Sequence, residues 1–223
     1  MSSDPPPIRT AVVTGGHSFE VVAFHELFRA LDGVDAYIQH MEDFCCDAGK
    51  CRNGYDAVVF YHMFRNGPTD EGPWYAGKQK SVLETLGETP QGIFLLHHAI
   101  LAYTDWPVWR QIAGIDGSSF SAFDHGETIP VHVVDAEHPI TRGLSDWEIV
   151  DETYTMADCD DDGRNRVLLT TEHPKCLKTI AWVRQYKQAR VFCLQLGHDG
   201  VAFANESLRE LVRRGIQWVA RRI

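Results

Sequence analysis

The stretch GIFLLHHAI, residues 92–100, decides the fold of this chain, because an apolar run passes directly into sequence of helical character. It predicts a buried strand that runs straight into a helix. Outward from it, three earlier apolar segments also predict strands, namely IRTAVVT (residues 8–14), VDAYIQ (34–39) and YDAVVFY (55–61). Helices are predicted from Glu20 to about Leu31, with Gly33 as a stop signal, and over residues 76–86.

The second half of the chain is less regular. Strands are predicted over residues 129–135 and 166–171, followed by a hairpin-like pair over 179–186 and 189–196 and an amphipathic helix over 206–222. The segment between the second and third strands, with Cys45, Cys46 and Cys51, predicts a polar loop. Because parallel neighbours need a crossover that is usually helical, the alternation predicts an α/β fold with a doubly wound, mainly parallel sheet and helices on both faces.

Composition predicts one domain over residues 8–223, preceded by a disordered, Pro-rich tail over residues 1–7. The chain has 223 residues, of which 44% are hydrophobic and 23% charged, as in an ordinary globular protein with one core. A net charge of −10 disfavours nucleic acid and anionic membranes as partners and points to a small-molecule ligand. The sequence shows neither a signal peptide nor a run of roughly 20 apolar residues, so we expect a cytoplasmic protein whose six cysteines are free thiols.

Histidines follow five of the predicted strands. They are His17, His40, His62, the pair His97 and His98, and His198. In open α/β sheets, ligands bind beyond the carboxyl ends of the strands, so these side chains are expected at one edge. Imidazole is a ligand of zinc and related ions and an acid–base group near neutral pH. For any one of these histidines, an ordinary polar residue at a strand end is the alternative interpretation.

Other motifs bear on which reactions and ligands are compatible with the sequence. His97 lies at the strand-to-helix junction where a nucleophile elbow would carry Ser or Cys, which disfavours acyl transfer from that position. The segment TGGHSFE fits no phosphate-binding motif. Aromatic residues near strand ends, among them Trp106 and Tyr154, are candidates either for a sugar platform or for core packing. Cys159 and Cys176 leave a thiol enzyme as a weaker alternative.

A family resemblance covers nearly the whole chain in order. It rests on TGGHSFE, GIFLLHHAI followed by DW, HPIT, DETY, IAW, RVFCLQLGHD and RRGIQWVAR. With these pieces the chain resembles the trehalose-utilisation, or ThuA-like, family. The resemblance implies a flavodoxin-like sheet related to class I glutamine amidotransferases without their nucleophile cysteine, and hence a protein that is not a glutamine amidotransferase. It also implies catabolism of trehalose or related disaccharides, and a bound metal.

The resemblance carries over to His17, His97, His125, Glu152 and His198. Our leading hypothesis is a metal-dependent hydrolase or isomerase of a sugar or keto-sugar. A divalent ion, zinc above all, would be held by some of His17, His97, His125 and His198, with Glu152, His97 and Asp199 as catalytic groups and Trp106, Tyr154 and His62 contacting substrate.

The alternative is a non-catalytic sugar-binding or regulatory module on the same fold. The exposed face of the last helix is expected to face either solvent or a second copy of the chain in a homodimer.

Overall fold

Five strands form the parallel half of the sheet in the computed structural model, which describes residues 5–223. In spatial order they are β2 (Val34–His40), β1 (Ile8–Gly15), β3 (Ala57–His62), β4 (Gly92–Leu96) and β9 (Ala189–Leu194). Each is parallel to its neighbour. All residues of β3 and β4 are buried, as expected for strands covered on both faces. These five strands agree with the predicted ones to within a few residues at each end.

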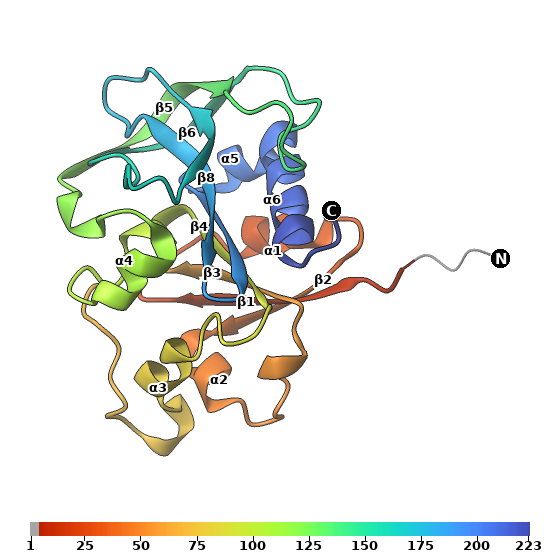
Figure 1. Ribbon diagram of the computed structural model, residues 1–223, viewed down its shortest axis with the longest axis vertical. Coiled ribbons are helices and arrows are strands. Elements are labelled where there is room, and N and C mark those ends of the chain that lie inside the picture. The colour runs from red at the N-terminus through yellow and green to blue at the C-terminus, as the bar shows by residue number, and fades with distance from the viewer. Residues whose placement is uncertain (1–4) are drawn as a thin grey trace.

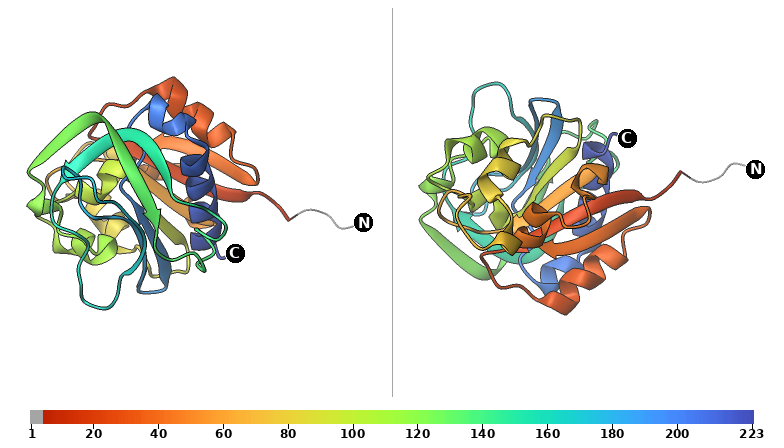
Figure 2. Two further views of the ribbon diagram at one scale, coloured as in Figure 1. Left: turned by 90° about the horizontal axis from the view of Figure 1, so that it is seen from above. Right: turned by 90° about the horizontal axis from the view of Figure 1, so that it is seen from below.

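Four strands continue the sheet beyond β9, each antiparallel to its neighbour. They are β8 (Thr179–Tyr186), β7 (Arg166–Thr170), β5 (Ala122–Val133) and β6 (Trp147–Thr155). In the left-hand view of Figure 2, β5 and β6 lie in the foreground as two long, curved strands. The sequence analysis missed β6, and β5 begins at Ala122 rather than at residue 129. The acidic residues of WEIVDETYT interrupt the apolar pattern that would otherwise indicate a strand.

Helices cover both faces of the sheet, which confirms the predicted fold class (Figure 1). Apolar side chains of α1 (Val21–Arg29), α5 (Gly200–Ala204) and α6 (Glu206–Val219) pack into the core on one face. Those of α2 (Met41–Cys46), α3 (Gln79–Glu84) and α4 (Pro107–Ala113) pack into the core on the other. Short 3-10 turns are η1 (Arg52–Gly54), η2 (Trp74–Ala76), η3 (His97–Leu101) and η4 (Gly117–Ser119).

The helix α2 corrects the prediction of a polar loop around Cys45 and Cys46. The ring of His40 caps it by accepting a hydrogen bond from the backbone N–H of Glu42 at 3.3 Å. Met41, Phe44 and Cys45 are buried, and their spacing of three and four residues places them on one helical face. The polar residues between them conceal this short amphipathic pattern in the sequence.

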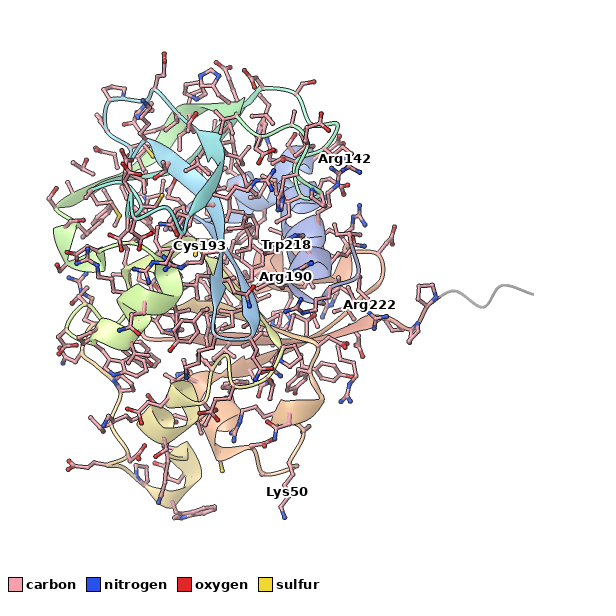
Figure 3. The ribbon with its side chains drawn as sticks, viewed as in Figure 1. Lys50, Arg142, Arg190, Cys193, Trp218 and Arg222 are labelled. Atoms are coloured by element: carbon pink, nitrogen blue, oxygen red, sulfur yellow. The ribbon has the colours of Figure 1, made fainter. Side chains whose placement is uncertain are left out.

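The C-terminal helix α6 packs along β4 and β9. It ends at Val219, three residues before the predicted end, and its buried face includes Leu208, Leu211 and Ile216. On its flank, Arg190 of β9 lies beside Trp218, with the guanidinium carbon 4.8 Å from the centre of the indole ring (Figure 3).

Three further predictions concern the ends and the surface of the chain. Residues 1–4 of the predicted disordered tail lie outside the described residues, and residues 5–7 are exposed and precede β1. All six cysteines are free, as expected. Within residues 5–223, the longest apolar helices are too short or too polar to cross a membrane.

Candidate functional site

A cavity of about 820 Å³ opens at the carboxyl ends of the parallel strands. This volume lies within the range of about 300–1,000 Å³ that is usual for small-molecule sites. Its lining combines residues that follow β1 and β3, such as Ser18 and Arg65, with residues of β5, β6 and the segment after β9. The predicted edge of the sheet is therefore where the cavity lies.

His97 stands at the junction of β4 and η3. Its backbone has φ +54°, a left-handed conformation that costs a non-glycine residue about 1–3 kcal/mol and that is found at sharp functional turns. The side chain is fully buried. Its Nδ1–H donates to the backbone carbonyl of Gln195 at 2.6 Å, since a carbonyl can only accept. The other ring nitrogen, Nε2, is thereby directed at the remaining groups of the site.

Three candidate ligand atoms converge at this point. His97 Nε2 lies 3.0 Å from Glu152 Oε2 and 3.3 Å from His198 Nδ1, and the last two atoms are 3.4 Å apart. Glu152 comes from β6 and His198 from the segment after β9, so distant parts of the chain meet here. This triangle of His97, Glu152 and His198 is the centre of the candidate site.

The triangle fits a divalent metal ion. Zinc bonds of about 2.0–2.1 Å in tetrahedral geometry place neighbouring ligand atoms roughly 3.3 Å apart, close to the separations found here. Two histidines and one carboxylate form a common catalytic donor set, and the hydrogen bond from His97 Nδ1 to a backbone carbonyl is the usual way to orient a ligating imidazole. With its proton on Nδ1, His97 has one lone pair at Nε2, which either accepts from the hydroxyl of Tyr154 at 2.7 Å or can bind a cation beside Glu152.

Electrostatics link the members of the triangle. Burial opposes ionisation of Glu152, but hydrogen bonds and positive charge from His198 and His97 hold the pKa of Glu152 well below its usual value. The hydrogen bond with Glu152, against the opposing effect of burial, raises the pKa of His198. The carboxylate of Glu152 is therefore charged at neutral pH and is available to a cation.

Asp151 holds the segment that carries His198. Its buried carboxylate accepts backbone hydrogen bonds from Gly197 at 2.7 Å, from Glu152 at 2.8 Å and from His198 at 3.0 Å. The hydroxyl of Tyr61 donates to the carbonyl oxygens of Gly197 and His198, both at 3.1 Å. These contacts fix the backbone on both sides of the His198 side chain.

The other predicted metal ligands lie at the rim of the triangle. His125 Nδ1 is 3.2 Å from Glu152 Oε1, and its ring lies 4.6 Å from that of His198, but its side chain is 56% exposed. His17 is exposed, lines the cavity and donates its Nδ1–H to the carbonyl of Ser18 at 2.6 Å. Its ring packs against His98 at 4.6 Å. The structure therefore brings His97 and His198 together and leaves His17 and His125 beside them.

Asp199 and Tyr154 also face the cavity. One carboxylate oxygen of Asp199 caps α5 by accepting from the backbone N–H groups of Val201 and Ala202, each at 3.0 Å. The hydroxyl of Tyr154 lies 2.7 Å from His97 Nε2, to which it donates when the ring is neutral. Both predicted residues are thus positioned at the candidate site.

His62 and Trp106 lie elsewhere. His62 is fully buried against Phe60, Tyr103 and Trp109, and neither of its ring nitrogens has a hydrogen-bond partner among residues 5–223. Trp106 is half-buried and packs against Tyr103. The residues that line the cavity include neither of these two predicted substrate contacts.

The cysteines offer little support for a thiol enzyme. Burial raises the pKa of the Cys176 thiol to about 12, despite a backbone hydrogen bond that opposes the shift. Burial also raises the pKa of Cys159. Both side chains are therefore protonated near neutral pH, and the reactive form of a cysteine is the thiolate.

Sequence reasoning missed several residues of the site. Asp151 was quoted within DETY but was assigned no role, although the carboxylate next to Glu152 could have marked it. Gln195, whose side-chain amide donates to the carbonyl of Glu152 at 2.7 Å, lies in the quoted RVFCLQLGHD without any distinguishing signal. Phe120 and Phe123 line the cavity and were not among the aromatic candidates.

The chain is similar to a known protein family and to several solved structures. The model of the ThuA family, described as trehalose utilisation, matches residues 22–219. Among solved structures, a ThuA-like protein from Parabacteroides merdae is similar, with a TM-score of 0.71 and 21% identity over 96% of this chain and 90% of that chain. A cytoplasmic protein from Salmonella typhimurium has a TM-score of 0.63 and 15% identity over 94% and 98% of the two chains.

A more distant similarity concerns the fold of the sheet. A glutamine amidotransferase from Thermotoga maritima has a TM-score of 0.53 and 10% identity over 96% of this chain and 98% of that chain. At these identities the structural likeness shows the fold alone, which is the ThuA-like and amidotransferase-like α/β fold that the resemblance implied. No curated protein matches the chain.

Proposed function

The chain belongs to the ThuA family of trehalose utilisation, and from this membership we infer that it is a metal-dependent enzyme of sugar catabolism. The family supports a role in sugar utilisation. We propose trehalose, a related disaccharide or a keto-sugar derived from one as the substrate, and hydrolysis or isomerisation as the reaction.

One observation carries the metal dependence. The separations of 3.0, 3.3 and 3.4 Å among His97 Nε2, Glu152 Oε2 and His198 Nδ1 match the spacing expected of three ligands around one small cation, which supports this proposal. We propose that these residues hold a divalent ion, zinc above all, with His125 and His17 close enough to assist. Bound there, such an ion would polarise a carbonyl group of the substrate or activate a water molecule.

The remaining polar groups of the cavity have complementary roles. Glu152 is enclosed by three histidines and serves as a ligand rather than as a free base. Asp199, which lines the cavity and follows His198 directly, is the proposed general base. Where His97 Nε2 holds the ion it would no longer accept from Tyr154, whose hydroxyl could then donate a hydrogen bond to a substrate oxygen. Burial raises the pKa of Tyr154 well above its usual value, so the hydroxyl keeps its proton at neutral pH.

Elemental analysis tests this proposal on untagged protein that is purified without added metal. We expect near-stoichiometric divalent metal in the wild type and its loss in His198→Ala. His132→Ala is the matched control, because His132 is a half-exposed histidine that pairs with Asp146 at 3.0 Å outside the triangle. Metal that is retained in His198→Ala, or a wild type that neither contains nor takes up zinc, manganese, iron or nickel, would contradict the proposed centre.

A second function is favoured by a different feature of the same triangle. When the histidines are protonated, His97 and His198 can each donate a hydrogen bond to the carboxylate of Glu152. The three side chains then form a complete hydrogen-bond network without any ion. A sugar-binding or regulatory module would keep such a network. In that case trehalose would still bind to protein treated with a chelator, and the sugar would be recovered unchanged.

Location and partners complete the proposal. We propose a cytoplasmic protein, on the ground that the similar Salmonella typhimurium structure is that of a cytoplasmic protein. Its proposed partner is a small sugar rather than a nucleic acid or a membrane, in keeping with the net charge of −10. A homodimer through the exposed face of α6 stays a prediction.

A further inference from the structure

Two phenylalanines form one wall of the cavity. Phe123 on β5 is 53% exposed and lines the cavity, although phenylalanine is ordinarily a core residue. Phe120, just before β5, lies nearly parallel to it, with 11° between the ring planes and 6.4 Å between the ring centres. The ring of Tyr154 meets Phe120 edge-on at 5.6 Å. An exposed apolar surface of this kind inside a cavity marks a binding surface.

The backbone of β5 directs this wall at the candidate metal centre. Phe123 pairs with Tyr154 of β6, and the register between these strands shifts between Asp124 and Glu127. Gly126, within that irregularity, has φ +68°, a conformation that glycine adopts without strain. β-bulges next to functional sites commonly redirect side chains. The result is that Phe123 and His125 lie together, with their ring centres 5.1 Å apart.

The wall and the triangle are therefore contiguous. His125 contacts Phe123 on one side, and its Nδ1 lies 3.2 Å from Glu152 Oε1 on the other. Only the side chain of His125 thus separates Glu152 from a molecule that covers the Phe123 ring. The rest of the lining supplies polar groups, including Ser18, Glu20 and Arg65.

We propose that Phe120 and Phe123 form a stacking platform for the apolar C–H face of a sugar ring. This inference rests on the proposed function and extends it by naming the substrate subsite. A pyranose ring has an apolar face and a polar rim. Its C–H groups suit the electron-rich face of an aromatic ring, while its hydroxyls can bond the polar groups on the rest of the lining.

A stacking role also accounts for phenylalanine, rather than a polar aromatic residue, at positions 120 and 123. A phenylalanine ring has no polar atom, so it contributes contact area without competing for the hydroxyls of the sugar. Ring orientation on the platform sets which carbon of the sugar lies toward the triangle of His97, Glu152 and His198. Phe123 is thus a binding and positioning residue, and the triangle is the reactive centre.

Isothermal titration calorimetry with trehalose, maltose and sucrose tests the platform. We expect Phe123→Ala to weaken binding of the accepted sugar roughly 10-fold, and Phe123→Trp to retain it because the ring face remains. Tyr75→Ala is the matched control, because Tyr75 is an aromatic residue of η2 with 54% exposure that does not line the cavity. Metal content should be the same in all of these variants.

The outcomes separate the platform from the proposed function. Equal sugar affinity in the wild type and in Phe123→Ala overturns the platform and leaves the metal-dependent sugar enzyme standing. A wild type that carries its metal but binds none of the three sugars overturns the platform and the disaccharide part of the substrate assignment together. A metal-free wild type whose sugar affinity falls in Phe123→Ala supports the platform and overturns the metal centre.

Discussion

Replacing Asp151 with asparagine should destabilise the protein and weaken the proposed metal site together. The substitution keeps the size of the side chain but removes its charge and one of its two acceptor oxygens. In the native structure one oxygen accepts from the backbone N–H groups of Glu152 and His198, and the other accepts from that of Gly197 at 2.7 Å. The amide group of asparagine would face Gly197 donor to donor.

The expected cost follows from these contacts. One charge-assisted hydrogen bond is lost, which is worth about 1.5–3 kcal/mol, and the N–H of Gly197 is left buried without a partner at a further cost of about 1–3 kcal/mol. Relief from burying a carboxylate offsets part of this sum. The net loss in the free energy of unfolding is about 2–4 kcal/mol, which corresponds to a fall in Tm of about 5–15 °C for a chain of this size.

Two measurements check the reasoning. Urea unfolding gives the loss of stability, and a competition titration with a zinc chelator should show metal affinity lowered by about 10–100-fold, because the backbone of His198 is no longer held. Asp146→Asn is the control: Asp146 also accepts from a backbone N–H, that of Val133 at 2.8 Å, but its side chain is 60% exposed, so we expect a change below about 1 kcal/mol. An Asp151→Asn protein with wild-type stability and metal affinity would refute the role given to Asp151.

Three further predictions concern the rest of the fold. Burial lowers the pKa of His62 to about 3, below its usual value, so the unfolded chain binds more protons than the native one between pH of about 6.5 and 3. Stability should therefore fall as pH drops through this window, and urea titrations at about pH 7.5 and pH 5 should show a smaller fall in His62→Phe; an identical fall would count against His62. In Gly92→Ala the added Cβ would lie 2.5 Å from the backbone carbon of Val219, so the end of α6 must shift at a cost of about 1–3 kcal/mol, seen as a lower Tm; unchanged melting would show that α6 yields freely. Cys176, with its pKa raised to about 12 by burial, should react with iodoacetamide far more slowly than the exposed Cys51, as mass spectrometry would show, and equal rates would contradict the burial argument.

Most of the parallel half of the sheet could be predicted because β1, β3, β4 and β9 are largely buried on both faces, whereas the edge strand β2 is only partly buried. β1, β3 and β4 appear in the sequence as nearly continuous apolar runs bounded by turn residues. The ends of the strands then located His97 and His198, which the structure brings within 3.3 Å of each other. Strand position placed these two at the predicted edge together with four other histidines, and the family resemblance singled them out.

The third member was not predictable from pattern. Glu152 lies on β6, where acidic residues hide the strand, so it was one of several groups available to complete a histidine site until the family resemblance carried over to it. Its burial is tolerated because His97, His125 and His198 surround its carboxylate. Such compensation depends on residues that are distant in the chain, and local sequence does not show it.

His62 shows a different limit of sequence reasoning. The end of a strand determines which edge of the sheet a residue occupies, but alternation along the strand determines which face its side chain joins. Tyr61 packs against Phe24 of α1, whereas His62, the next residue, packs against Trp109 of α4 on the opposite face. His62 therefore lies at the predicted edge of the sheet, at the end of β3, but its side chain is directed into the core.

The dispersal of the triangle along the chain has a consequence for biosynthesis. His97 and His198 are separated by 101 residues, and Glu152 lies between them. Contacts of such long range form late, after the entropy of closing large loops has been overcome. During translation, the donor atoms cannot gather until the segment after β9 has left the ribosome. A nascent chain therefore has no gathered donor set before that point, and the proposed metal could bind only after the segment that carries His198 has folded onto β4 and β6.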